Sequence, residues 1–208
     1  MDHKLPNTIP IFPLSSAIFF PKTILPLNIF ETRYIQLVND CMKNNRLFGM
    51  VQPKSKKNLN EVYRVGCLGK IVSFNETNDK RFIITLSGII RFRIEEEVKS
   101  EKLYREFKVN YSDFLKDLDD DQSIKVPNKD IIKKIKEFFN RNDYLIEFNE
   151  LEKLNFDQMI STICMISPFS VEEKQKLIET VKIEDKISAL EKIINFNLLA
   201  NSNNKTIQ

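Results

Sequence analysis

Glu31 and Arg33 stand two residues apart, where an apolar, proline-containing segment gives way to an amphipathic one. An acid and a base so close together could serve proton transfer, or could present a charged surface to a partner. Asn28 precedes Glu31 by three residues, as in a capping box, and the helix dipole favours an acid in the first turn. We therefore expect a structural role, with Asn28 and Glu31 capping a helix and Arg33 facing outward.

Other catalytic groups are scarce. The sole histidine, His3, lies near the start of the chain, so Ser-His or Cys-His activation lacks its base. A Ser-Lys dyad stays open, but no particular pair stands out. Cys41, Cys67 and Cys164 are too far apart for a disulfide framework or a zinc cluster. The GCLGK stretch at Gly66 lacks the spacing of a phosphate-binding loop. We expect no catalytic residue, no cofactor and no metal.

Basic residues raise the alternative of RNA binding. They gather in one polar loop and on one face of a later strand: Lys54, Lys56, Lys57, Arg81, Arg91 and Arg93. The formal charge of the 208 residues is only +3, however, and nucleic-acid binders usually add exposed aromatic rings and a larger basic excess. We interpret these residues as solvated faces.

The first half of the chain has the pattern of a sheet. Residues 8–15 and 17–27 are apolar and contain prolines, which suits edge strands. A helical stripe follows, made of Phe30, Tyr34, Leu37, Val38, Cys41 and Met42. Residues 81–94 then alternate with a period of two, and Gly88 predicts a bulge or a bend. Several such strands with one buried face predict a small barrel.

The composition changes after residue 115. Residues 116–127 are acidic and predict a linker; the run Asp119–Asp121 could attract a hard metal ion, but acidic runs are usually solvated. From residue 128 to 200 apolar stripes recur at helical spacing, and Ser170 with Glu173 forms a capping box. We expect a bundle of three or four helices, followed by a flexible tail at 201–208.

These pieces, in this order, resemble a known family. IPIFPLSSAIFFPKTILPLNIFETRY, RLFGMV, VGCLGKIVSF, SGIIRFRI and the helical end from SPFSVEEKQ onward are similar to motifs of the Lon protease N-terminal (LON substrate-binding) domain. Asn28, Thr32, Cys67 and Lys186 depart from its usual residues. Signature positions that we expect to be structural are Pro26, Phe30, Glu31, Arg33, Tyr34, Gly88, Arg91 and Phe92.

The resemblance implies an α+β fold: a PUA-like β pseudo-barrel (1–115), mixed or antiparallel, with one helix after the second strand, then the helical bundle. It also implies a free-standing member of the family, because neither the ATPase nor the protease module of Lon is in the sequence. The implied function is non-catalytic binding of unfolded or degron-bearing polypeptides, or an adaptor role beside a separate protease or chaperone.

We expect the peptide-binding residues in the proline-containing strands, at Phe12, Phe19, Phe20 and Ile29. RNA binding by a PUA-like barrel is the alternative function, and a hydrolase activity is the least favoured. The sequence shows neither a signal peptide nor a membrane span, so we expect a cytoplasmic protein.

Overall fold

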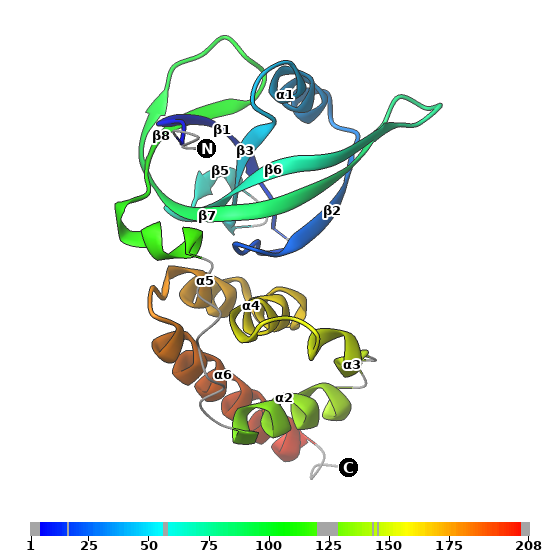
Figure 1. The fold of residues 1–208 in the computed structure, drawn as a ribbon, viewed down its shortest axis with the longest axis vertical. Helices are drawn as coiled ribbons and strands as arrows, with labels where there is room; N and C mark the ends of the chain where they lie inside the picture. The colour runs from blue at the N-terminus through cyan, green and yellow to red at the C-terminus, as the bar shows by residue number, and fades with distance from the viewer. Residues whose placement is uncertain are drawn as a thin grey trace. The chain divides into compact units, whose positions relative to one another are not determined.

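The computed structural model describes residues 5–15, 17–55, 58–119, 129–142, 144 and 146–204. The chain divides into two compact units, residues 1–119 and 120–208. The first contains the sheets, and the second consists of helices (Figure 1). The chain is therefore an α+β protein, as the sequence predicts.

In its described residues, the first unit has eight strands, one α-helix and one 3-10 helix. The strands are β1 (Thr8–Pro13), β2 (Ile24–Ile29), β3 (Leu47–Val51), β4 (Pro53–Ser55), β5 (Asn58–Val62), β6 (Val65–Glu76), β7 (Phe82–Val98) and β8 (Arg105–Asn110). The helices are α1 (Thr32–Lys43), after the second strand as predicted, and η1 (Ser112–Leu118). Of the predicted polar loop around Lys54, the described residues on either side belong to β4 and β5, which pair with each other.

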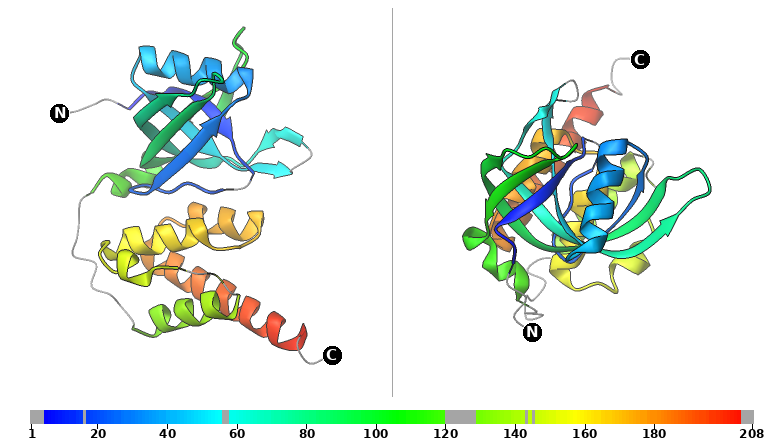
Figure 2. Two further views of the ribbon diagram at one scale, coloured as in Figure 1. Left: turned by 90° about the vertical axis from the view of Figure 1, so that its right-hand side faces the viewer. Right: turned by 90° about the horizontal axis from the view of Figure 1, so that it is seen from above.

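The main sheet closes on itself. Its order is β2-β7-β6-β3-β1-β8, and β8 pairs again with β7. The strands from β7 round to β8 thus form a closed, mixed pseudo-barrel, in which β1 and β3 are parallel (Figure 2). In that ring β1 is paired on both edges, whereas β2 lies outside the ring and pairs with β7.

The long strand β7 has the predicted alternation. Its inward side chains are buried: Phe82, Ile84, Leu86, Ile90, Phe92 and Ile94. The register with β6 shifts beside Gly88, which confirms the predicted irregularity. A Cβ atom on Gly88 would lie 2.0 Å from the carbonyl oxygen of Phe20, so only glycine allows the two backbones to approach this closely.

Helix α1 buries the predicted stripe at Tyr34, Leu37, Val38 and Cys41. Phe30 precedes the helix and is 64% exposed, so its placement in that stripe was wrong. The predicted capping box is also wrong, because Asn28 belongs to β2, opposite Ile83. Glu31 occupies the N-cap position without a side-chain cap.

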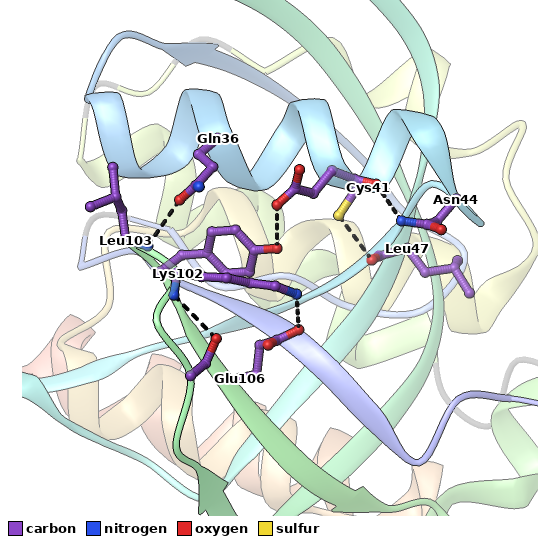
Figure 3. Close-up of polar contacts among 10 residues, drawn as sticks. Gln36, Cys41, Asn44, Leu47, Lys102, Leu103 and Glu106 are labelled. Carbon is purple, nitrogen blue, oxygen red and sulfur yellow. Dashed lines mark hydrogen bonds and ion pairs between the residues drawn. The ribbon is translucent and has the colours of Figure 1, made fainter.

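Polar contacts tie α1 to the connection between β7 and β8 (Figure 3). The Tyr104 hydroxyl donates to the Asp40 carboxylate over 2.8 Å, and the Leu103 amide donates to the Gln36 side chain over 2.9 Å. Both acceptors lie on α1. The pairs therefore hold the helix against a part of the chain that follows it by more than sixty residues.

The predicted linker begins too early, because η1 is part of the barrel unit. Asp117 accepts hydrogen bonds from the Arg91 main-chain amide and guanidinium, at 2.7–2.9 Å. The two side chains are only 3% (Arg91) and 9% (Asp117) exposed, and the guanidinium lies 4.7 Å from the Phe114 ring centre. Arg91 was thus wrongly placed on a solvated face, since η1 covers it. Residues 120–127 of the predicted linker lie outside the described residues.

The second unit contains α2 (Lys129–Arg141), α3 (Phe148–Leu151), α4 (Phe156–Ile166), α5 (Val171–Glu179) and α6 (Ile183–Asn204). Its core contains the predicted stripes: Ile131, Ile135, Phe138, Phe139, Phe156, Met159, Ile160, Ile163, Leu190 and Ile194. The capping box of Ser170 and Glu173 is present. Residues 201–204, predicted as tail, continue α6; residues 205–208 lie outside the described residues.

We expect Asp117→Ala to lower the free energy of unfolding by about 3–5 kcal/mol, because it leaves the Arg91 charge buried without its partner. Asp113→Ala is the matched control, since Asp113 is also on η1 and pairs with Arg93, but both side chains are half exposed. It should cost at most about 1 kcal/mol. Denaturant unfolding of both variants measures the difference; equal losses would contradict this account of the pair.

A second prediction concerns pH. Burial, and then the hydrogen bond to Asp40, raise the pKa of Tyr104 from 10.0 to about 12. The folded state therefore favours the protonated phenol, and this contribution to stability is complete below pH 10 and lost as the pH rises toward 12. Tyr104→Phe should be less stable than wild type near neutral pH, and the gap should narrow over that window. A constant gap in denaturant unfolding from pH 8 to 12 would argue against it.

Candidate functional site

The four predicted peptide-binding residues are not at the surface. Phe12, Phe19, Phe20 and Ile29 are all buried. The Phe12 ring lies 4.1 Å from that of Tyr34, and the Phe19 ring is so close to Gly69 that a Cβ there would meet it at 2.7 Å. Proline restricts main-chain pairing but does not turn a side chain outward, so these aromatic rings fill the barrel. Buried side chains cannot contact a bound peptide, so the expectation of peptide-binding residues at these four positions was wrong.

The surface feature that the structure does provide is the outer edge of β2. The Gly88 amide donates to the carbonyl of Thr23 over 2.9 Å. The β2–β7 register has Ile24 opposite Ser87 and therefore Thr23 opposite Gly88. The bond thus identifies Thr23 as a residue of β2 whose main-chain groups point toward β7. In an antiparallel pair the facing residues alternate. Leu25 and its alternate neighbours therefore bond to β7, and Ile24, Pro26 and Asn28 turn their main-chain groups away from it.

In the described part of the chain, no hydrogen bond is made by the outward main-chain groups of Ile24, Pro26 and Asn28. Pro26 has no amide hydrogen, and an edge of this kind is where a sheet tolerates proline. The edge thus presents the N–H groups of Ile24 and Asn28 and three carbonyl oxygens. These are the main-chain donors and acceptors with which a further strand would pair.

The outer face beside this edge is largely apolar, with one exposed charge at Lys70, which lies opposite Ser87. Ile24 is 52% exposed, Ile83 on β7 is 47% exposed, and Val72 on β6 is 55% exposed. Phe30 lies one residue beyond the end of β2. We call the following residues the β2 surface: Ile24, Pro26, Asn28, Phe30, Val72, Ser73, Ile83 and Thr85. Exposed apolar patches with a polar margin resemble protein interfaces.

The acid and base of the opening motif pair with each other. The Arg33 guanidinium donates to the Glu31 carboxylate over 2.8–3.0 Å, and both side chains are more than a third exposed. The guanidinium also lies 4.5 Å from the Tyr34 ring centre. The pair therefore joins two neighbours at the helix start.

Four of the remaining signature residues pack within the barrel unit. Tyr34 and Phe92 are buried in the barrel, and burial raises the pKa of the Tyr34 phenol. Gly88 allows the close approach to Phe20, and Arg91 holds η1. Pro26 and Phe30 are the two that belong to the β2 surface. Two signals in the sequence pointed to it: a proline inside a strand, and Ile83 on the more polar face of β7.

The arginines considered for RNA binding are each paired with an aspartate: Arg81 with Asp79, Arg91 with Asp117, and Arg93 with Asp113. These pairs neutralise the basic stripe. Lys56 and Lys57 lie outside the described residues.

The thiols are poor nucleophiles. Burial raises the pKa of Cys41 and Cys164 to about 12 and that of Cys67 well above its ordinary value. All three are free thiols, and because their pKa values are raised they stay protonated at neutral pH. Over the residues described, no group of three or more His, Cys, Asp or Glu side chains could hold a metal ion.

Solved structures share this fold. A Lon N-terminal domain protein from Xanthomonas campestris superimposes with a TM-score of 0.62, over 90% of this chain and 97% of that one, at 18% identity. The N-terminal domain of Lon protease from the Mycobacterium avium complex gives 0.60 over 90% and 98%, at 12% identity. The architecture is thus that of the Lon N-terminal domains.

Sequence comparison agrees. The profile of the ATP-dependent protease La (LON) substrate-binding domain matches residues 8–195, and the chain belongs to this family. Lon protease of Syntrophus aciditrophicus is 27% identical over 94% of this chain, and that of Cytophaga hutchinsonii is 29% identical over 85%. The chain spans only 26% and 22% of those two proteins. In the described residues, no helix has the length and apolarity that crossing a membrane requires.

Amide hydrogen exchange can test the assignment of the β2 edge. The amides of Ile24 and Asn28 should exchange close to the rate of an unstructured chain, because they point to solvent. Those of Leu25, Leu27 and Ile29 should exchange at least about 100-fold more slowly, because they bond to β7. Residue-resolved exchange by NMR measures both sets, and slow exchange at Ile24 and Asn28 would show that the edge is covered.

Proposed function

We propose that this protein is a non-catalytic polypeptide-binding module that engages unfolded or degron-bearing segments through the β2 surface. The observation that carries the proposal is the coincidence of an unfilled strand edge with exposed, uncharged Ile24, Phe30 and Ile83. An unfolded chain offers what such a surface accepts: apolar side chains and unpaired main-chain groups. The family's description as substrate-binding supports the same function.

The proposal includes no chemical step by the chain itself. Glu31 and Arg33 neutralise each other at the surface, and the thiols are held protonated. Binding without chemistry suits an adaptor that delivers a segment to a separate protease or chaperone in protein quality control. We place this role in the cytoplasm, where buried cysteines remain reduced.

Ile24→Asp and Phe30→Asp should each weaken the binding of a permanently unfolded, carboxymethylated protein by about 10-fold or more. Covering an apolar side chain of this size contributes about 1.5–3 kcal/mol, and a new carboxylate opposes its burial. Fluorescence anisotropy of the labelled unfolded protein measures the affinity.

Leu103→Asp is the matched control. Leu103 is 59% exposed, comparable with Ile24 and Phe30, but lies in the connection between β7 and β8, outside the β2 surface. Its variant should bind as wild type does. Equal weakening in all three variants, with unchanged circular dichroism, would show that binding depends on general hydrophobicity rather than on the β2 surface.

A further inference from the structure

We propose that the bound segment adds to the barrel as a further strand along β2, and that Pro26 leaves one gap in the new hydrogen-bond ladder. This inference rests on the proposed function and deepens it, because it defines the substrate class. The class is an extended polypeptide stretch without charged side chains over the length of β2. The contacts that distinguish it are main-chain hydrogen bonds rather than a pocket for one side chain.

The first argument is the complementarity of partial charges. At the outer edge of β2 the carbonyls of Ile24, Pro26 and Asn28 recur at every second residue, about 7 Å apart, and the N–H groups of Ile24 and Asn28 lie on either side of the gap at Pro26. An extended chain presents N–H and C=O groups with the same repeat along one edge. These groups are unbonded among the described residues, so pairing them with a second chain removes no bond within the barrel unit.

The second argument comes from the side chains next to the new strand. Side chains of the segment on the outer face of the sheet would lie beside Ile24, Pro26 and Asn28. Those on the barrel side would lie beside Leu25 and Leu27. Leu25 is buried and Leu27 is half-buried. A charged side chain on either face would lose hydration without gaining an ionic partner, because none of these five residues is charged. This excludes strongly charged segments and favours β-branched and aromatic ones.

Pro26 limits the strength of the interaction. The carbonyl of the incoming chain opposite Pro26 would find no donor, so the ladder is interrupted in its middle. Proline on an exposed edge is also a known means of preventing long-lived strand pairing between copies. The expected result is a reversible interaction that does not grow into an aggregate. An alanine at this position would supply the missing N–H.

The experiment uses the full chain and a fluorescent peptide of alternating valine and threonine in three forms: unmodified, N-methylated at every second residue, and N-methylated at every residue. Alternate methylation leaves one edge of the peptide intact, so this form should bind as the unmodified peptide does. Full methylation removes every N–H donor and should weaken binding about 10-fold or more. Saturation with unmodified peptide should also slow amide exchange at Ile24 and Asn28 about 10-fold or more, with little change at Leu25.

Pro26→Ala adds one hydrogen bond and should tighten binding of the unmodified peptide about fivefold. Unchanged affinity in a folded variant would overturn the register proposed here. If Pro26→Ala does not fold, the peptide series and the exchange measurement on wild type decide the matter.

The two proposals fail in different ways. If peptides bind but full methylation has no effect, and Ile24 and Asn28 keep exchanging rapidly, then strand addition is wrong and the proposed function stands. If neither the peptides nor the unfolded protein bind, the proposed function itself is wrong. If the wild-type chain dimerises in sedimentation and its Ile24 and Asn28 amides are protected without peptide, the edge is occupied by a second copy, which also overturns the inference.

Discussion

The close approach of two backbones at Gly88 is the constraint from which the rest of the barrel unit follows. β7 is 17 residues long and pairs with β6 along most of its length, with β2 through residues 82–87 and with β8 through residues 93–98. β7 has to change direction along its length to pair with all three strands. The register shift beside Gly88 provides the change, and the missing side chain lets the Phe20 carbonyl pass against it.

Closure of the ring between β7 and β8 has a consequence for β2. The second half of β7 takes β8 as its neighbour, and the ring is completed through β1, β3 and β6. β2 then has β7 on one edge and no strand on the other among the described residues. The open edge is thus a product of how the barrel closes, and the proposed function uses a position that the closure leaves unfilled.

The distribution of charge supports the same division of the surface. The ion pairs at Arg91 and Arg93 lie toward the second half of β7, where they hold η1 to the barrel. Their arginines therefore contribute to the fold rather than to a basic interface. Around Ile24 and Ile83, in contrast, the outward positions of β2 and β7 are apolar or neutral, and Lys70 on β6 is the neighbouring charge. The ion pairs and the β2 surface consequently lie toward opposite ends of one strand.

The sequence by itself determined the local patterns: the alternation of β7, the stripe of α1, the capping box at Ser170, the α+β class and the family resemblance. These depend on residues close together in the chain, where periodicity and hydrogen-bonding geometry suffice. Tertiary structure decided which apolar residues face water. Five residues lie in similar apolar segments near prolines, but four are buried (Phe12, Phe19, Phe20 and Ile29) and Phe30 is exposed. They differ because burial depends on partners distant in the chain. Asp117, far from Arg91 in sequence, and the open edge of β2 likewise exist only once the barrel has closed.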